Sequence, residues 1–71
     1  MNKEILGKFG KIVRKERIKR RLSQEKFAEI VGVHRTYIGM IERGEKNITL
    51  SNIYKIGRAL KITISELLSG L

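Results

Sequence analysis

The chain has 71 residues, no cysteine and a formal net charge of +9. A chain this short cannot divide its apolar surface between two cores, so we expect residues 1–71 to form a single domain. The missing cysteines exclude a disulfide and a thiolate metal site, and the positive charge favours a polyanionic partner.

The first helix is predicted from about Asn2 to Arg20. Its core-facing positions are expected to be Ile5, Phe9, Ile12, Val13 and Glu16. Gly7 and Gly10 each cost roughly 1 kcal/mol relative to Ala, which predicts fraying of the first turns. Nine of the sixteen basic residues fall within residues 1–21, against two acidic ones. This cluster is either a contact for a polyanion or a solvated face that keeps the protein soluble.

Two short helices joined by a tight turn are predicted between Leu22 and Gly44. Ser23 can cap the first of them, with Lys26 where a capping box would have Glu or Gln. Gly32 can take a positive φ at the bend. The apolar positions recur at a spacing of three or four and predict a shared core: Phe27, Ala28, Ile30, Val31, Val33, Ile38 and Ile41.

A fourth helix is predicted from Leu50 to Leu60 with Thr49 as its cap, and a short fifth helix follows Thr63, whose capping-box partner is Glu66. The C-terminal end is rich in apolar residues for so short a helix. Two interpretations stay open for these residues, a homodimer interface or an intramolecular core; they are Ile62, Ile64, Leu67, Leu68 and Leu71.

The central segment SQEKFAEIVGVHRTYIGMIERG resembles the helix-turn-helix of the phage-repressor and Cro type. The likeness extends from about Val13 to Leu68 and implies an all-α, compact five-helix domain of the lambda-repressor-like DNA-binding type. Within that family, RTYIGMIERGEKNITL is most similar to the small controller proteins of restriction-modification operons. The resemblance also implies an ion pair between Arg17 and Glu42.

Two residues of the first helical region depart from the family pattern. Glu16 stands where an apolar residue is usual. Arg21 stands where a Gly often ends the first helix, and a left-handed Arg costs of order 1 kcal/mol. We therefore expect a differently shaped first loop.

On a helical wheel, Ile38 and Ile41 point one way, and Thr36, Gly39, Met40 and Arg43 point the other. The first turn of a recognition helix meets base edges, and an Arg there can form two hydrogen bonds with a guanine. The residues predicted to contact bases are therefore Arg35, Thr36 and Met40. Gly39 would let the helix backbone approach the groove.

The remaining contacts are expected to go to the DNA backbone. The main candidates are Gln24, which the family resemblance places there, and Tyr37, Arg43, Lys46 and Asn47, with Ser51 and Asn52 as weaker ones. The alternatives are that Tyr37 belongs to the core and that Lys46 is merely solvated.

No catalytic or metal-binding set is apparent. The chain has one histidine, His34, and no Asp, so neither a triad nor a metal site is supported. His34 occupies the cap position of the recognition helix, where it would cap weakly or touch a phosphate. We expect no enzymatic activity and no cofactor.

These observations predict a homodimeric, sequence-specific regulator that binds a near-palindromic site on double-stranded DNA with the 34–43 helix in the major groove. An activating form would also contact RNA polymerase. One alternative is an antitoxin-like or phage-type repressor whose C-terminal surface binds another protein, and another is a nonspecific polyanion binder. No apolar run approaches the roughly 18 residues of a membrane span, and no apolar signal region is present, so a cytoplasmic location without membrane contact is expected.

Overall fold

Residues 3–71, which a computed structural model describes, form five helices and no strand. These are α1 (Lys3–Lys19), α2 (Gln24–Val31), α3 (Arg35–Glu42), α4 (Leu50–Leu60) and α5 (Ile64–Leu68). The predicted all-α, five-helix fold is confirmed. The predicted start of α1 at Asn2 lies outside the described residues.

The helix boundaries follow from short-range hydrogen bonds. The Ser23 side chain accepts from the amide of Lys26 at 2.9 Å and begins α2, and Gly32 ends α2 with a φ of 91°. Thr49 caps α4, and Thr63 with Glu66 forms a complete capping box at α5. Each of these bonds satisfies a backbone group that a helix end leaves without a partner.

The loop after α1 accommodates Arg21 in the left-handed conformation, with a φ of 57°. The chain therefore keeps the backbone geometry that a Gly usually provides and places an Arg in it, at a cost of order 1 kcal/mol. Lys61 does the same after α4, with a φ of 59°. Glu16, the other departure from the family pattern, is half-buried, and its carboxylate pairs with Arg20 at 2.7 Å.

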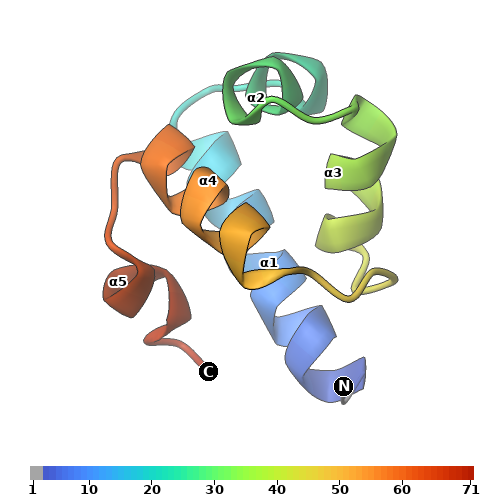
Figure 1. Ribbon diagram of the computed structural model, residues 1–71, viewed down its shortest axis with the longest axis vertical. Coiled ribbons are helices and arrows are strands. Elements are labelled where there is room, and N and C mark those ends of the chain that lie inside the picture. The colour runs from blue at the N-terminus through green and yellow to red at the C-terminus, as the bar shows by residue number, and fades with distance from the viewer. Residues whose placement is uncertain (1–2) are drawn as a thin grey trace.

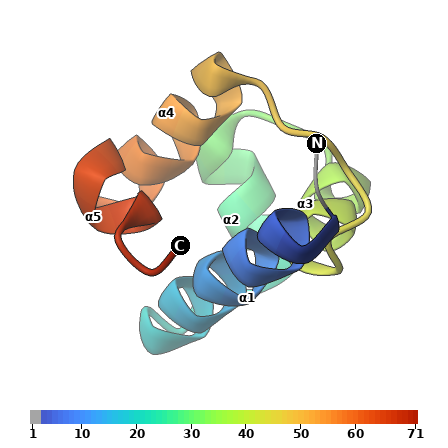
Figure 2. The same cartoon turned by 90° about the horizontal axis from the view of Figure 1, so that it is seen from below.

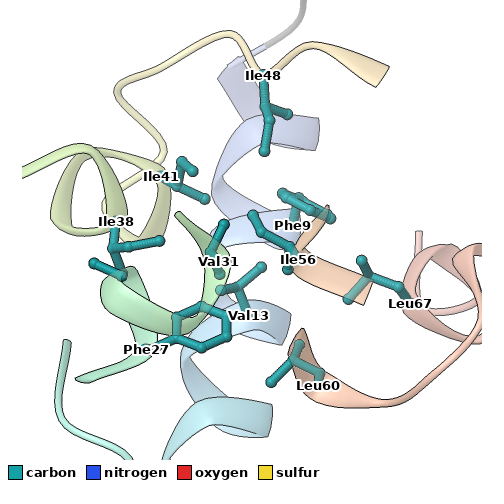
Figure 3. Close-up of a cluster of buried hydrophobic side chains, with 11 residues drawn as sticks. Phe9, Val13, Phe27, Val31, Ile38, Ile41, Ile48, Ile56, Leu60 and Leu67 are labelled. Atoms are coloured by element: carbon teal, nitrogen blue, oxygen red, sulfur yellow. The ribbon is translucent and has the colours of Figure 1, made fainter. Parts of the chain in front are cut away.

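The five helices, arranged as in Figure 1, contribute side chains to one hydrophobic core. Seen from below, α1 lies along one side of the domain and α4 on the opposite side (Figure 2). Side chains from all five helices meet between them, as Figure 3 shows for Phe9, Phe27, Ile38, Ile56 and Leu67.

Two residues predicted to face the core do not. Ile5 is 44% exposed and Ile30 is 48% exposed. In α1 the inward positions belong to Leu6, Phe9 and Val13, and Ile5 is turned about 100° from Leu6 around the helix axis. Ile30 lies on the outer flank of α2, beside the buried Val31.

Gly10 allows α1 to pack directly against the end of α3. A Cβ at this position would overlap the carbonyl oxygens of Ile41 and Glu42, the second at 2.7 Å. Gly7 differs, because a Cβ there would have nothing within 4 Å. The sequence-based view of Gly10 as a weak point of the helix was therefore incomplete, since its missing side chain is what brings the two backbones together.

An ion pair between Arg17 and Glu42 lies beside this contact. Arg17 donates from Nε to Oε2 of Glu42 at 2.7 Å and from Nη2 to Oε1 at 3.0 Å. The two side chains are 10% and 3% exposed. Arg17 also donates from Nη1 to the carbonyl of Leu22 at 2.7 Å, and the Gln24 amide donates to Glu42 at 3.1 Å. The pair thus joins α1, the first loop, α2 and α3.

We predict that Gly10→Ala lowers the free energy of unfolding by about 2 kcal/mol, because the added methyl group has no room between two backbones. The matched change Gly7→Ala should be neutral or raise it by up to about 1 kcal/mol through better helix propensity. Urea titration followed by circular dichroism measures both. Equal effects of the two substitutions would contradict the close contact.

Glu42→Gln should lower the free energy of unfolding by about 3 kcal/mol, because it leaves the Arg17 charge buried without a counter-ion. For a domain of this size that corresponds to a fall in melting temperature of more than about 10 °C. Glu29→Gln is the control, since Glu29 pairs with Lys26 on the surface at 3.4 Å and its loss should change stability by at most about 0.5 kcal/mol. If the two variants had similar melting temperatures, the buried ion pair would not be required for the stability of the fold.

Candidate DNA-binding surface

The outward face of α3 carries the three residues predicted to contact bases. Arg35 and Thr36 are exposed, and Met40 is half-buried at the edge of the same face. On the opposite face, Ile38 and Ile41 are almost completely buried. The helix is therefore anchored in the core along one side and presents polar and apolar contact groups along the other.

His34 caps the start of this helix. Its Nδ1 accepts from the amide of Thr36 at 3.1 Å, so of the two roles expected for this residue the structure shows capping. The cap orders the turn that holds Arg35 and Thr36.

Arg43 lies at the end of α3 and covers Gly39. A Cβ on Gly39 would come within 3.1 Å of Nη1 of Arg43 and within 3.8 Å of the Gln24 side-chain oxygen. Gly39 is buried beneath the side chains of Arg43 and Gln24, both of which were predicted to contact phosphate. The approach of its backbone to a DNA groove stays a prediction.

The loop between α3 and α4 is exposed and carries Lys46 and Asn47. The Nε of Arg43 donates to the Glu45 carboxylate at 3.0 Å, and this hydrogen bond raises the pKa of the Arg43 guanidinium. Arg43 and Asn47 line one shallow depression together with Lys3 of α1. Lys3 belongs to the N-terminal basic cluster, and nothing local in the sequence places it next to this loop.

Tyr37 joins α3 to α4. Its ring packs against the core, and its hydroxyl accepts from the side-chain amide of Asn52 at 2.9 Å. The hydroxyl and the Asn52 amide are therefore already paired in the free protein. Ser51 is exposed at the start of α4.

Eight of the nine cations in the N-terminal basic cluster fall into two groups, and the ninth, Arg21, is exposed in the loop after α1. Arg17 and Arg20 turn inward: Arg20 donates to the Leu60 carbonyl at 2.9 Å and to the Glu16 carboxylate at 2.7 Å. The hydrogen bond from Arg20 lowers the pKa of Glu16. The exposed cations of α1 are Lys3, Lys8, Lys11, Arg14, Lys15 and Lys19. Part of the basic cluster seen in the sequence, namely Arg17 and Arg20, therefore holds α1 to other helices.

The five C-terminal residues proposed for a dimer interface are buried to different extents. Leu67 is completely buried in the core of its own chain, so its assignment to an interface was wrong, because no atom of it is left to meet a partner. Ile62 and Leu68 are partly buried against the same core, and Leu71 is 47% exposed.

Across residues 3–71 we find no set of three acidic or histidine side chains close enough to hold a metal ion. None of the helices in that part of the chain has the length and apolar character needed to cross a bilayer.

Comparison with known proteins places this geometry in a family. Residues 13–67 match the helix-turn-helix family. The chain is 48% identical to the control protein C.SmaI of Serratia marcescens over 67 residues, which cover 94% of this chain and 76% of that protein.

Solved structures agree with the sequence comparison. The restriction-modification controller protein C.AhdI from Aeromonas hydrophila superimposes with a TM-score of 0.85 at 45% identity, over 87% of this chain and 94% of that one. The controller protein C.Esp1396I in its nucleoprotein complex superimposes with a TM-score of 0.81 at 29% identity, over 92% and 88% of the two chains. The chain therefore belongs to the helix-turn-helix family of DNA-binding regulators, of the phage-repressor and Cro type.

Proposed function

We propose that this protein is the controller of a restriction-modification operon, which binds a near-palindromic operator as a homodimer. The observation that carries the proposal is the two-sided α3, with Ile38 and Ile41 locked in the core and Arg35 and Thr36 exposed. An α-helix fits the major groove of B-DNA, where each base pair presents a distinct set of donors and acceptors. The named relatives are control proteins of such systems.

In this proposal Arg35 donates two hydrogen bonds to a guanine. Thr36 offers a hydroxyl to a base edge and a methyl to a thymine, and Met40 adds an apolar contact one turn later. The DNA backbone is held by Gln24 and Tyr37 on one side, and by Arg43, Lys46 and Asn47 at the end of α3 and in the loop that follows. The side chains of Gln24 and Tyr37 are already oriented by hydrogen bonds to Glu42 and Asn52.

The homodimer would place two copies of α3 in successive major grooves, about 10 base pairs apart. Its interface would use the C-terminal apolar residues that the core leaves accessible, which are Ile62, Ile64, Leu68 and Leu71. Because the relatives are named as control proteins, we infer that the dimer acts at its own operon. Repression would follow from covering a promoter, and activation from contact with RNA polymerase. Such a role requires no cofactor and no catalysis.

Selection of bound sequences from random duplexes should return two inverted half-sites about 10 base pairs apart, because the two recognition helices of a dimer are related by a twofold axis. Sedimentation at micromolar concentration should give twice the mass of the chain. Equal retention of all sequences would favour nonspecific polyanion binding, and a monomer that still selects a single half-site would remove the dimer from the proposal.

Arg35→Ala should abolish the preference at one base position of each half-site, a loss of about 1 to 3 kcal/mol of discrimination. Arg43→Ala should instead weaken binding to all sequences alike. It should also lower the slope of log affinity against log salt concentration by about one, the amount expected for one lost phosphate contact. Fluorescence anisotropy with single-base variants of the selected operator, at several salt concentrations, measures both effects. If Arg35→Ala weakened every sequence uniformly, base recognition would have to be assigned to another residue.

A further inference from the structure

An acidic side chain lies beside the arginine that we assign to base recognition. Glu25, in the first turn of α2, places Oε2 at 3.8 Å from Nη1 of Arg35, the first residue of α3. The two side chains are 77% and 67% exposed. Both residues line a shallow depression between the two helices. An ion pair this exposed contributes little to the stability of the fold. Its main effect is therefore expected on how Arg35 binds DNA.

We propose that Glu25 is a specificity-determining residue that acts through Arg35, by making Arg35 selective for a neutral base edge over a phosphate. The proposal rests on the function proposed above, in which Arg35 contacts a guanine. Glu25 itself need not touch DNA. It is a positioning residue, and its effect comes from the negative charge that it holds next to the guanidinium.

The geometry of the guanidinium permits both interactions at once. An Arg has five N–H donors in a planar fork. Because Glu25 faces Nη1, the edge formed by Nε and Nη2 remains available. In this same protein, that edge of Arg17 holds the two oxygens of Glu42 at 2.7 and 3.0 Å. Arg35 can therefore present its Nε–Nη2 edge to O6 and N7 of a guanine while Nη1 stays near Glu25.

A phosphate differs from a guanine edge in its charge. The acceptors O6 and N7 are neutral, so they add no charge repulsion beside the Glu25 carboxylate. A phosphate oxygen carries a negative charge, and like charges at short distance oppose each other. Glu25 should therefore weaken the Arg35–phosphate contact more than the Arg35–guanine contact. This is discrimination through an unfavourable interaction with the wrong partner, and on non-operator DNA it keeps Arg35 from adding to nonspecific affinity.

The chain offers a matched control in Glu29. It lies on the same helix, lines the same depression and has the same charge, but it pairs with Lys26 at 3.4 Å. Glu25→Gln and Glu29→Gln change the net charge equally, so their general effect on attraction to DNA is comparable. The difference between them reports the interaction with Arg35.

The experiment measures binding of Glu25→Gln and Glu29→Gln to the selected operator and to a scrambled duplex of equal composition. Glu25→Gln should strengthen binding to the scrambled duplex about threefold more than Glu29→Gln does, an effect of the size expected for an exposed charge pair. The ratio of operator to scrambled affinity should fall by a similar factor. For the scrambled duplex, the slope of log affinity against log salt concentration should become steeper by about one, as expected for one added phosphate contact. A merely structural role of Glu25 would not change this slope.

The same pair of substitutions is then made in the Arg35→Ala background, where the two should become equivalent. Equal effects of Glu25→Gln and Glu29→Gln in the presence of Arg35 would overturn the proposal, and so would a difference that persists without Arg35. If Arg35→Ala alone keeps the full base preference, the base contact proposed for Arg35 fails, and the role of Glu25 that depends on it fails as well. If Arg35→Ala loses the preference but Glu25→Gln and Glu29→Gln act alike, only the role of Glu25 fails. The two ideas are thus tested separately.

Discussion

The buried ion pair between Arg17 and Glu42 is the interaction on which the rest of this structure depends. A charge removed from water is costly unless it is paired and hydrogen-bonded, and here each guanidinium nitrogen of Arg17 and each carboxylate oxygen of Glu42 has a hydrogen-bond partner. The pair meets the Leu22 carbonyl and the Gln24 amide, so it joins three helices and one loop. Beside it, Gly10 lets the α1 backbone touch the end of α3. Together these two contacts fix how α1 packs against the end of α3.

The arginines of this chain differ in function because they differ in exposure. Arg17 is buried and donates a hydrogen bond within the fold from each of its three guanidinium nitrogens, and Arg20 joins the end of α1 to the end of α4. Arg35 and Arg43 are exposed, and each lies near a carboxylate, Glu25 or Glu45. In an exposed pair water competes with the carboxylate, so a nucleic acid can replace or share the contact. Burial thus separates cations that build the domain from cations that can meet DNA.

Much of the fold could be predicted from the sequence, because helix starts and stops depend on neighbouring residues. The caps at Ser23, Thr49 and Thr63 and the bend at Gly32 involve groups at most five residues apart, so a local pattern contains all the participants. The family resemblance added the arrangement of the five helices. It also added the candidate site, whose outward face follows from the spacing of the buried Ile38 and Ile41.

The sequence by itself thus determined the helices, their caps and the residues of α3 that face away from the core. Tertiary packing alone decided the rest: that Gly10 permits a close contact, that Ile5 and Ile30 stay exposed, that Leu67 fills the core, and that Glu25 lies beside Arg35. The physical reason is the range of the interactions. Arg17 and Glu42 are 25 residues apart and Glu25 and Arg35 are ten apart, so their contacts exist only once the helices have packed.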